Sequence, residues 1–123
     1  MIEKRKRIAE IYRKELEGIK YLTDKKGVKH NYQYFPILID SKKYGRSRDE
    51  IYEELKKNNI FSRRYFYPLI SQFPTYRGLP SANAENLPVA EKVTREVLCL
   101  PIYPDLGLDK LKKIIEILKP IKA

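Results

Sequence analysis

The sequence predicts an α+β fold, a small α/β sandwich in which an open sheet of about three strands is covered by helices on one face. Its 123 residues suit one domain, and a hydrophobic content of 42% is enough for one core. Helical and strand-like patterns also alternate along the chain, in the order helix, strand, helix, strand, long loop, helix, strand, helix. Strands separated by helices are typical of a sheet with a helical cover.

The first predicted helix covers residues 2–17. Apolar residues recur at spacings of three and four, and basic residues fill the other face. Gly18 is expected to end it. The helix begins almost at Met1 without a capping residue, as would a helix cut within its length or one with a frayed natural start.

Residues 20–31 are polar and predict turns. The run from Tyr32 to Ile39 predicts a strand that is buried on at least one face. Because Pro36 has no N–H to donate, it is expected to face an edge or a bulge. The following segment, SKKYGRS (41–47), predicts a turn.

Ser47 and Glu50 form a capping box that predicts a helix ending at Asn58-Asn59. Three of its residues are expected to face inward, namely Ile51, Tyr52 and Leu55. Residues 60–66 then predict a second strand.

Residues 69–86 are irregular and too long for a simple connection, which is typical of functional or partner-covered loops. Asn86-Leu87-Pro88 predicts a helix start, because proline is tolerated in the first turn. The buried face of this helix is expected to hold Val89, Ala90, Val93 and Val97. A short strand at 98–100 and an amphipathic helix ending before Pro120 complete the chain.

The net charge of +10 favours polyanionic or phosphorylated partners such as nucleic acid, anionic lipid or a nucleotide. The single cysteine and single histidine exclude a disulfide framework and a Cys/His zinc cluster, so no metal site is predicted. No apolar run is long enough for a membrane span, and the N-terminus does not resemble a secretory signal. A soluble cytoplasmic protein is expected.

The segment from Phe61 to Leu69 (FSRRYFYPL) has the richest binding chemistry. Two arginines followed by three aromatic residues could hold a phosphate and stack on a flat ring, which suits a nucleotide. An ordinary strand with alternating core and solvent positions explains the same residues equally well.

No self-sufficient active site is predicted. Cys99 lies between two leucines and is expected to be a buried, inert thiol, and His30 is expected to be a solvated loop residue. The carboxylates of residues 49–54 are typical of capping and solvent-facing positions. No lysine has the apolar surroundings of a Schiff-base residue.

Three stretches resemble the C-terminal portion of the DegT/DnrJ/EryC1/StrS family of pyridoxal-phosphate-dependent sugar aminotransferases. They are HNYQYFPILI (30–39), SRDEIYEELKKNNIFSRRYFYPLISQFPTYR (47–77) and NLPVAEKVTREVLCLPIYPDL (86–106). With the flanking helices, the resemblance extends over essentially the whole chain. The RRYFYPL form is most similar to members that act on dTDP-linked 4-keto-6-deoxyhexoses.

The resemblance implies the small C-terminal domain of an aspartate-aminotransferase-type enzyme of fold type I. Residues 1–123 would form this single domain, with residues 1–18 as the end of the helix that links it to a large domain. The family transfers an amino group, usually from glutamate, to a keto nucleotide sugar, with pyridoxal phosphate as electron sink. The large domain, which carries the Schiff-base lysine, would be the missing partner. The isolated chain is then expected to be inactive and to bind no pyridoxal phosphate covalently, and the full-length enzyme to be a homodimer.

In many family members the loop after the second strand carries His-Tyr, one further residue and Pro-Leu-His. Aligned on Pro68-Leu69, those His, Tyr and final His positions hold Tyr65, Phe66 and Ile70 here. Because the family's Schiff-base lysine and the aspartate that pairs with the pyridine nitrogen belong to the large domain, we predict no catalytic or cofactor-binding residue in this chain. The resemblance places Arg63, Arg64, Tyr65 and Tyr67 on the wall nearest the nucleotide sugar. A small basic nucleic-acid-binding module is the alternative, supported by the net charge and the arginine-aromatic segment.

Overall fold

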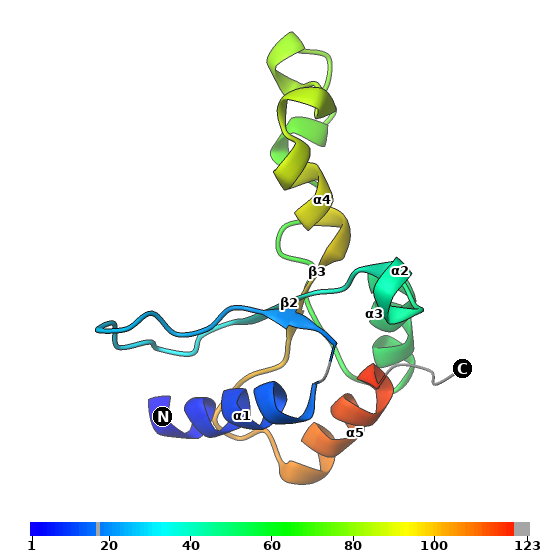
Figure 1. Cartoon of the computed structure of the whole chain (residues 1–123). Helices are drawn as coiled ribbons and strands as arrows, with labels where there is room; N and C mark the ends of the chain where they lie inside the picture. Colours follow the sequence, from blue (N-terminus) through cyan, green and yellow to red (C-terminus); the bar gives the residue numbers. More distant parts are fainter. Residues whose placement is uncertain (17, 120–123) are drawn as a thin grey trace.

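A three-stranded antiparallel sheet lies at the centre of the computed structural model, which describes residues 1–16 and 18–119 (Figure 1). The strands are β1 (Lys20–Tyr21), β2 (Phe35–Leu38) and β3 (Val97–Leu100), with β2 in the middle. The α-helices are α1 (Ile2–Glu15), α2 (Ser41–Tyr44), α3 (Arg48–Lys57), α4 (Pro88–Glu96) and α5 (Leu108–Leu118). The predicted α+β class with a small open sheet is confirmed.

One face of the sheet carries the hydrophobic core. Phe35 and Ile37 of β2 pair with Leu100 and Leu98 of β3, and all four side chains are buried. They pack with apolar residues from three helices, namely Ile8, Ala9 and Tyr12 of α1, Ile51 and Leu55 of α3, and Leu111, Ile114 and Leu118 of α5. Each fully buried aliphatic side chain stabilises the fold by roughly 1.5–3 kcal/mol, so this core holds the sheet and the three helices together.

Pro36 lies in the central strand, although the sequence predicted an edge or a bulge for it. Its partner Cys99 uses both its backbone N–H and its C=O on Arg63. The Pro36–Cys99 pair is therefore not hydrogen-bonded, and the proline nitrogen faces the side of β1. Because β1 ends with Tyr21 opposite Ile37, no strand needs a donor at that position.

The helix predictions agree with the structure in most respects. No side chain caps α1, as predicted, and Gly18 follows with a φ of +76°. The predicted end of this helix at residue 17 lies outside the described residues. The capping box of Ser47 and Glu50 is present at α3, and Asn58 is its C-cap. Helix α5 is confirmed to Leu118, while Pro120 is not among the described residues.

Three local predictions are wrong. Residues 20–21, predicted as turn, form β1 because Lys20 and Tyr21 pair with β2. The predicted turn at 41–47 contains the one-turn helix α2, which Asp40 caps. The predicted second strand at 60–66 is reduced to a single bridge between Arg63 and Cys99, because the chain turns away from β3 after that pair.

Residues 66–93 project from the sheet and helices, as the green-to-yellow ribbon in Figure 1 shows, and we call them the arm. The predicted irregular region is confirmed, with three short 3-10 turns at Ile70–Gln72, Pro80–Ala82 and Ala84–Asn86. No side chain from residue 63 to residue 93 is buried. The rest of the described chain, which we call the body, holds the whole core.

The predicted buried face of α4 is therefore wrong in part. Val89 is 74% exposed, and Ala90 and Val93 are only partly buried, because α4 runs along the arm and most of it lies off the sheet. The buried residue of this helix is Thr94, at its junction with β3. Val97 is buried as predicted, but as the first residue of β3.

No helix within residues 1–16 and 18–119 combines the length and the apolar character that crossing a membrane needs.

Candidate functional site

The arginine-aromatic segment, residues 63–67, lies where the chain leaves the body for the arm. The Arg63 N–H donates to the Cys99 carbonyl at 3.1 Å, and the Cys99 N–H donates back at 2.7 Å. This pair fastens the start of the segment to the outer edge of β3. The residues that follow, 64–67, are positioned by the contacts of their own side chains.

Arg64 is held against α3. Its Nη1 donates to Asp49 Oδ1 at 3.1 Å, and its Cζ lies 4.4 Å from the Tyr52 ring centroid and 5.0 Å from that of Tyr67. An arginine with these contacts is already occupied by the protein. Its guanidinium is oriented by α3 and is not available as a free anion ligand.

Arg63 differs from its neighbour. Its side chain is exposed and makes no hydrogen bond, ion pair or aromatic contact with residues 1–16 or 18–119. Adjacent residues of an extended segment point to opposite sides, which agrees with this division between Arg63 and Arg64. The guanidinium of Arg63 is therefore the one that can meet an external anion.

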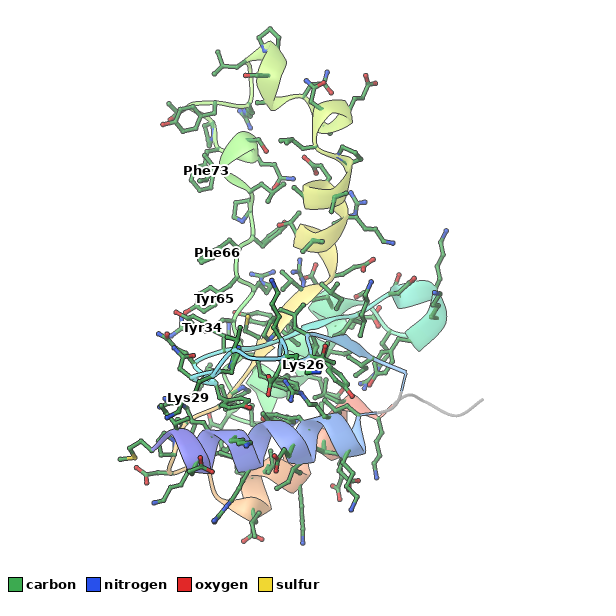
Figure 2. All side chains as sticks on the ribbon, turned by 60° about the vertical axis from the view of Figure 1, so that its left-hand side comes forward. Lys26, Lys29, Tyr34, Tyr65, Phe66 and Phe73 are labelled. Carbon is green, nitrogen blue, oxygen red and sulfur yellow. The ribbon has the colours of Figure 1, made fainter. Side chains whose placement is uncertain are left out.

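Aromatic rings, of which Tyr65 is half-buried and Tyr34 and Phe66 are exposed, continue along the edge next to Arg63. The Tyr65 ring lies 5.6 Å from that of Tyr34 in an edge-to-face arrangement and 5.0 Å from that of Phe66. Tyr34 is 54% exposed and Phe66 is 75% exposed. Figure 2 shows Phe73, Phe66, Tyr65 and Tyr34 following one edge of the molecule, with Lys29 beyond them. Such rings can stack on a planar ligand.

Tyr67 is placed differently from Tyr65. Its ring centroid lies 4.9 Å from the Cζ of Arg48 and 5.0 Å from that of Arg64. Its role in this structure is to contact two guanidiniums at the base of the arm. Of the four predicted site residues, Arg63 is exposed without a side-chain partner among the described residues, and Arg64 contacts groups of α3. Tyr65 is half-buried against Tyr34 and Phe66, and Tyr67 is 46% exposed with its ring near two guanidiniums.

Sequence reasoning missed two residues of this region, Tyr34 and Arg48. Tyr34 could have been found, because strand alternation puts it on the face opposite to the buried Phe35. Arg48 gives no such signal: a charged residue at the first position of a helix is expected to be solvated, yet it is 2% exposed.

Two hollows flank this region. An apolar one of about 630 Å³ lies on the arm and is lined by Phe66, Tyr67, Pro68, Leu69, Ile70, Phe73, Leu87 and Ala90 among others. A larger one of about 900 Å³ lies between α3 and α5. Its walls carry five carboxylates (Asp49, Glu50, Glu53, Glu54 and Glu116) and three basic side chains (Arg46, Lys57 and Lys119), so the lining is net negative. Because these carboxylates repel an anion, the larger hollow does not suit a phosphorylated ligand.

Two further candidate side chains, Cys99 and His30, lie as the sequence predicted. Burial raises the pKa of the Cys99 thiol, which favours its protonated, unreactive form. His30 is exposed, and its Nδ1 accepts the Tyr32 N–H at 2.8 Å. Among the described residues, no group of three His, Cys, Asp or Glu side chains could hold a metal ion.

Comparison with known protein families shows which family this chain belongs to. The sequence profile of the DegT/DnrJ/EryC1/StrS aminotransferase family matches residues 1–119. The chain belongs to this family. Its structure agrees: the crystal structure of DesI in the presence of its TDP-sugar product has a TM-score of 0.83 and 30% sequence identity, and the match covers 95% of this chain and 30% of that one.

Two curated relatives of this aminotransferase-family chain are named as transaminases of a dTDP-linked amino sugar. A dTDP-4-amino-4,6-dideoxy-D-glucose transaminase of Escherichia coli is 53% identical over 120 residues, which is 95% of this chain and 32% of the relative. A protein of the same name from Shigella dysenteriae is 38% identical over 109 residues, covering 89% and 29% of the two chains. The chain thus spans about a third of the length of these relatives. The family match gives no support to the alternative of a nucleic-acid-binding module.

The cofactor that the family implies, pyridoxal phosphate, needs a lysine for its Schiff base and donors for its phosphate. A Schiff-base lysine is activated in an apolar or cationic pocket. Every lysine among residues 1–16 and 18–119 is exposed instead. The residues described here do not fit the cofactor, and we assign none of them to holding it.

Proposed function

We propose that this chain is the C-terminal small domain of a pyridoxal-phosphate-dependent aminotransferase that acts on a nucleotide sugar. The observation that carries the proposal is the 53% identity over 120 residues to the Escherichia coli transaminase named for a dTDP-amino sugar. The amino donor is glutamate and the acceptor is a dTDP-linked 4-keto-6-deoxyhexose. The product serves polysaccharide biosynthesis in the cytoplasm.

In this proposal residues 1–123 form one domain, and residues 1–18 are the end of the helix that links it to a large domain. The large domain supplies the lysine and the phosphate site for the cofactor. Two copies of the full-length chain form a homodimer. The isolated 123-residue chain is inactive and forms no covalent adduct with pyridoxal phosphate, because every lysine of residues 1–16 and 18–119 is exposed.

The proposed substrate wall is the segment 63–67. Arg63 donates to the diphosphate of the nucleotide sugar, because its guanidinium is exposed and forms no ion pair with the described residues. Tyr65 lines the wall beside it. Arg64 and Tyr67 belong to the same wall but act by shaping it, since both contact groups on α3.

A chimera tests the proposal, in which this chain replaces the matching third of the Escherichia coli relative. We expect the chimera to transaminate the keto sugar nucleotide with glutamate. Arg63→Ala should remove a charge-assisted bond and raise the KM for the nucleotide sugar by the equivalent of about 1.5–3 kcal/mol. The KM for glutamate should not change, because glutamate has no diphosphate.

Arg95→Ala is the matched control, since Arg95 is an exposed arginine on α4 outside the segment 63–67. A folded chimera that binds pyridoxal phosphate but transfers no amino group would contradict the proposed function. An active chimera in which neither Arg63→Ala nor Arg64→Ala affects the nucleotide sugar would contradict the site assignment alone.

A further inference from the structure

A buried guanidinium lies at the base of the arm, and the reaction proposed above does not use it. Arg48 is the first residue of α3 and is 2% exposed. A buried charge is costly unless it is paired and hydrogen-bonded. Arg48 meets this requirement with three hydrogen bonds, each to a group whose position affects the arm.

Two of these bonds hold the chain where it returns from the arm. Arg48 Nη1 donates to the Thr94 carbonyl at 2.8 Å and to the Val97 carbonyl at 2.9 Å. Thr94 lies in the last turn of α4, where carbonyls have no partner within the helix. Val97 is the first residue of β3. One nitrogen of Arg48 therefore ties the end of α4 to the start of β3.

The same side chain also contacts the chain where it leaves for the arm. The Tyr67 ring lies 4.9 Å from Arg48 Cζ and 5.0 Å from Arg64 Cζ. Asp49 joins the two arginines, because its Oδ1 accepts from Arg48 Nε at 2.7 Å and from Arg64 Nη1 at 3.1 Å. The outgoing chain is thus fixed to α3 by the two guanidiniums and one carboxylate.

A further hydrogen bond joins the segment that leaves for the arm to the segment that returns from it. Thr94 Oγ1 donates to the Phe66 carbonyl at 2.8 Å. Beyond this point, no side chain of the arm up to residue 93 is buried. Packing along the arm therefore contributes little to its direction, and the contacts at its base must determine where it points.

We propose that Arg48 is a positioning residue that fixes the direction of the arm and, with it, the orientation of the segment 63–67. Its importance for the enzyme rests on the proposed function, but its effect on the arm is a property of this chain alone. An arginine is required, because its planar group offers several donors and a face that stacks on Tyr67. Lysine offers a single ammonium, and methionine offers neither charge nor donors.

The test measures the direction of the arm in the 123-residue chain. Spin labels are attached to Ser81→Cys on the arm and Lys113→Cys on α5, both exposed positions, in a Cys99→Ala background. Pulsed electron spin resonance then gives the distribution of distances between the labels. We expect a narrow distribution with Arg48 and a broad one with Arg48→Lys or Arg48→Met. Circular dichroism and melting temperature report separately whether the body is folded.

Arg95→Met is the control, since it removes an exposed arginine next to Thr94 and should leave the distribution narrow. If Arg48→Met does not fold, Arg48→Lys and Asp49→Asn test the proposal instead, and both should broaden the distance distribution. A narrow distribution in a folded Arg48 variant, even one with a lowered melting temperature, would overturn the proposal. This outcome is independent of whether the chimera is active, so it distinguishes failure of this inference from failure of the proposed function.

Discussion

The body and the arm are built by different physical means. The body buries a continuous apolar core between the sheet and helices α1, α3 and α5. The arm buries none of its side chains, and its backbone hydrogen bonds in the 69–87 stretch are local, such as Phe73 N to Ile70 O. Ordering a chain costs conformational entropy that burial normally offsets. The comparison indicates that apolar burial stabilises the body, whereas the arm is held by polar and aromatic contacts at its base.

The body and the arm also differ in net charge. The arm contains Arg77 and Lys92 against Glu85 and Glu91, so its net charge is zero. The net charge of +10 therefore belongs to the rest of the chain. A neutral segment with exposed Phe66, Ile70, Phe73, Leu79 and Val89 suits an apolar protein surface better than a polyanion.

The largest expected difference between the regions is in the cost of removing a leucine side chain. Leu55 of α3 is fully buried, so Leu55→Ala should lower the free energy of unfolding by about 2–5 kcal/mol. Leu79 of the arm is 52% exposed, and Leu79→Ala should change it by less than about 0.5 kcal/mol. Urea unfolding of the two variants measures both values. Equal losses at the two positions would refute the distinction between body and arm.

A second expected difference is in self-association of the chain alone. Its exposed apolar arm should bind a hydrophobic dye and promote association, which should increase with added salt if apolar contacts dominate. Phe73→Glu should reduce both effects. Phe61→Glu changes a ring of the body that is more exposed (64% against 39% for Phe73) and should not reduce them. Analytical ultracentrifugation with dye fluorescence provides the measurement. A wild-type chain that stays monomeric and binds no dye at high concentration would contradict this expectation.

The sequence was informative where a core imposes periodicity. Helix α5 could be predicted because the burial of Leu111 and its neighbours leaves a repeating apolar pattern. Helix α3 could be predicted because Ser47 and Glu50 form a capping box at its start. Val89 on α4 has the same apolar character but is 74% exposed, because no element of the body packs over it. Apolar periodicity identifies a face that will be covered, and it does not say by what.

The candidate site shows a similar limit. Arg63 and Arg64 are identical in type and adjacent, and the sequence could not tell which one is exposed. The difference comes from Asp49 and Tyr52 on another helix, which attract Arg64 through contacts that no local pattern encodes. The buried Arg48 was missed for the same reason, since its partners are carbonyls nearly fifty residues away.

The smallest expected effect concerns a basic loop of the body. Asp24 accepts a hydrogen bond from Arg13 at 3.0 Å and one from the Tyr32 hydroxyl, and these bonds lower the pKa of its carboxyl below the ordinary value of 3.8. A lowered pKa means that the bonds stabilise the fold above the ordinary value and that this contribution is lost as the pH falls through the folded pKa. Residues 22–34 should therefore loosen at acid pH before the core does.

Nuclear magnetic resonance of the Tyr32 ring follows this loosening. The pH is lowered from about 5 to about 2, so that it passes from above the ordinary pKa of an aspartate carboxyl to below it. Asp24→Asn should make the loop insensitive to pH in that range. Loosening that persists unchanged in Asp24→Asn would show that another group is responsible.

Hydrogen exchange of the chain alone and of the chimera tests the central claim most directly. The account predicts slow exchange of the amides in β2, β3 and α5 in both proteins. It predicts faster exchange across residues 66–93 than in the body of the isolated chain, because the exposed hydrogen bonds of the arm open locally while its base stays fixed. It predicts greater protection of the same residues once the large domain of the relative is present. An arm as well protected as the body in the isolated chain, or one that stays unprotected in the active chimera, would contradict the account.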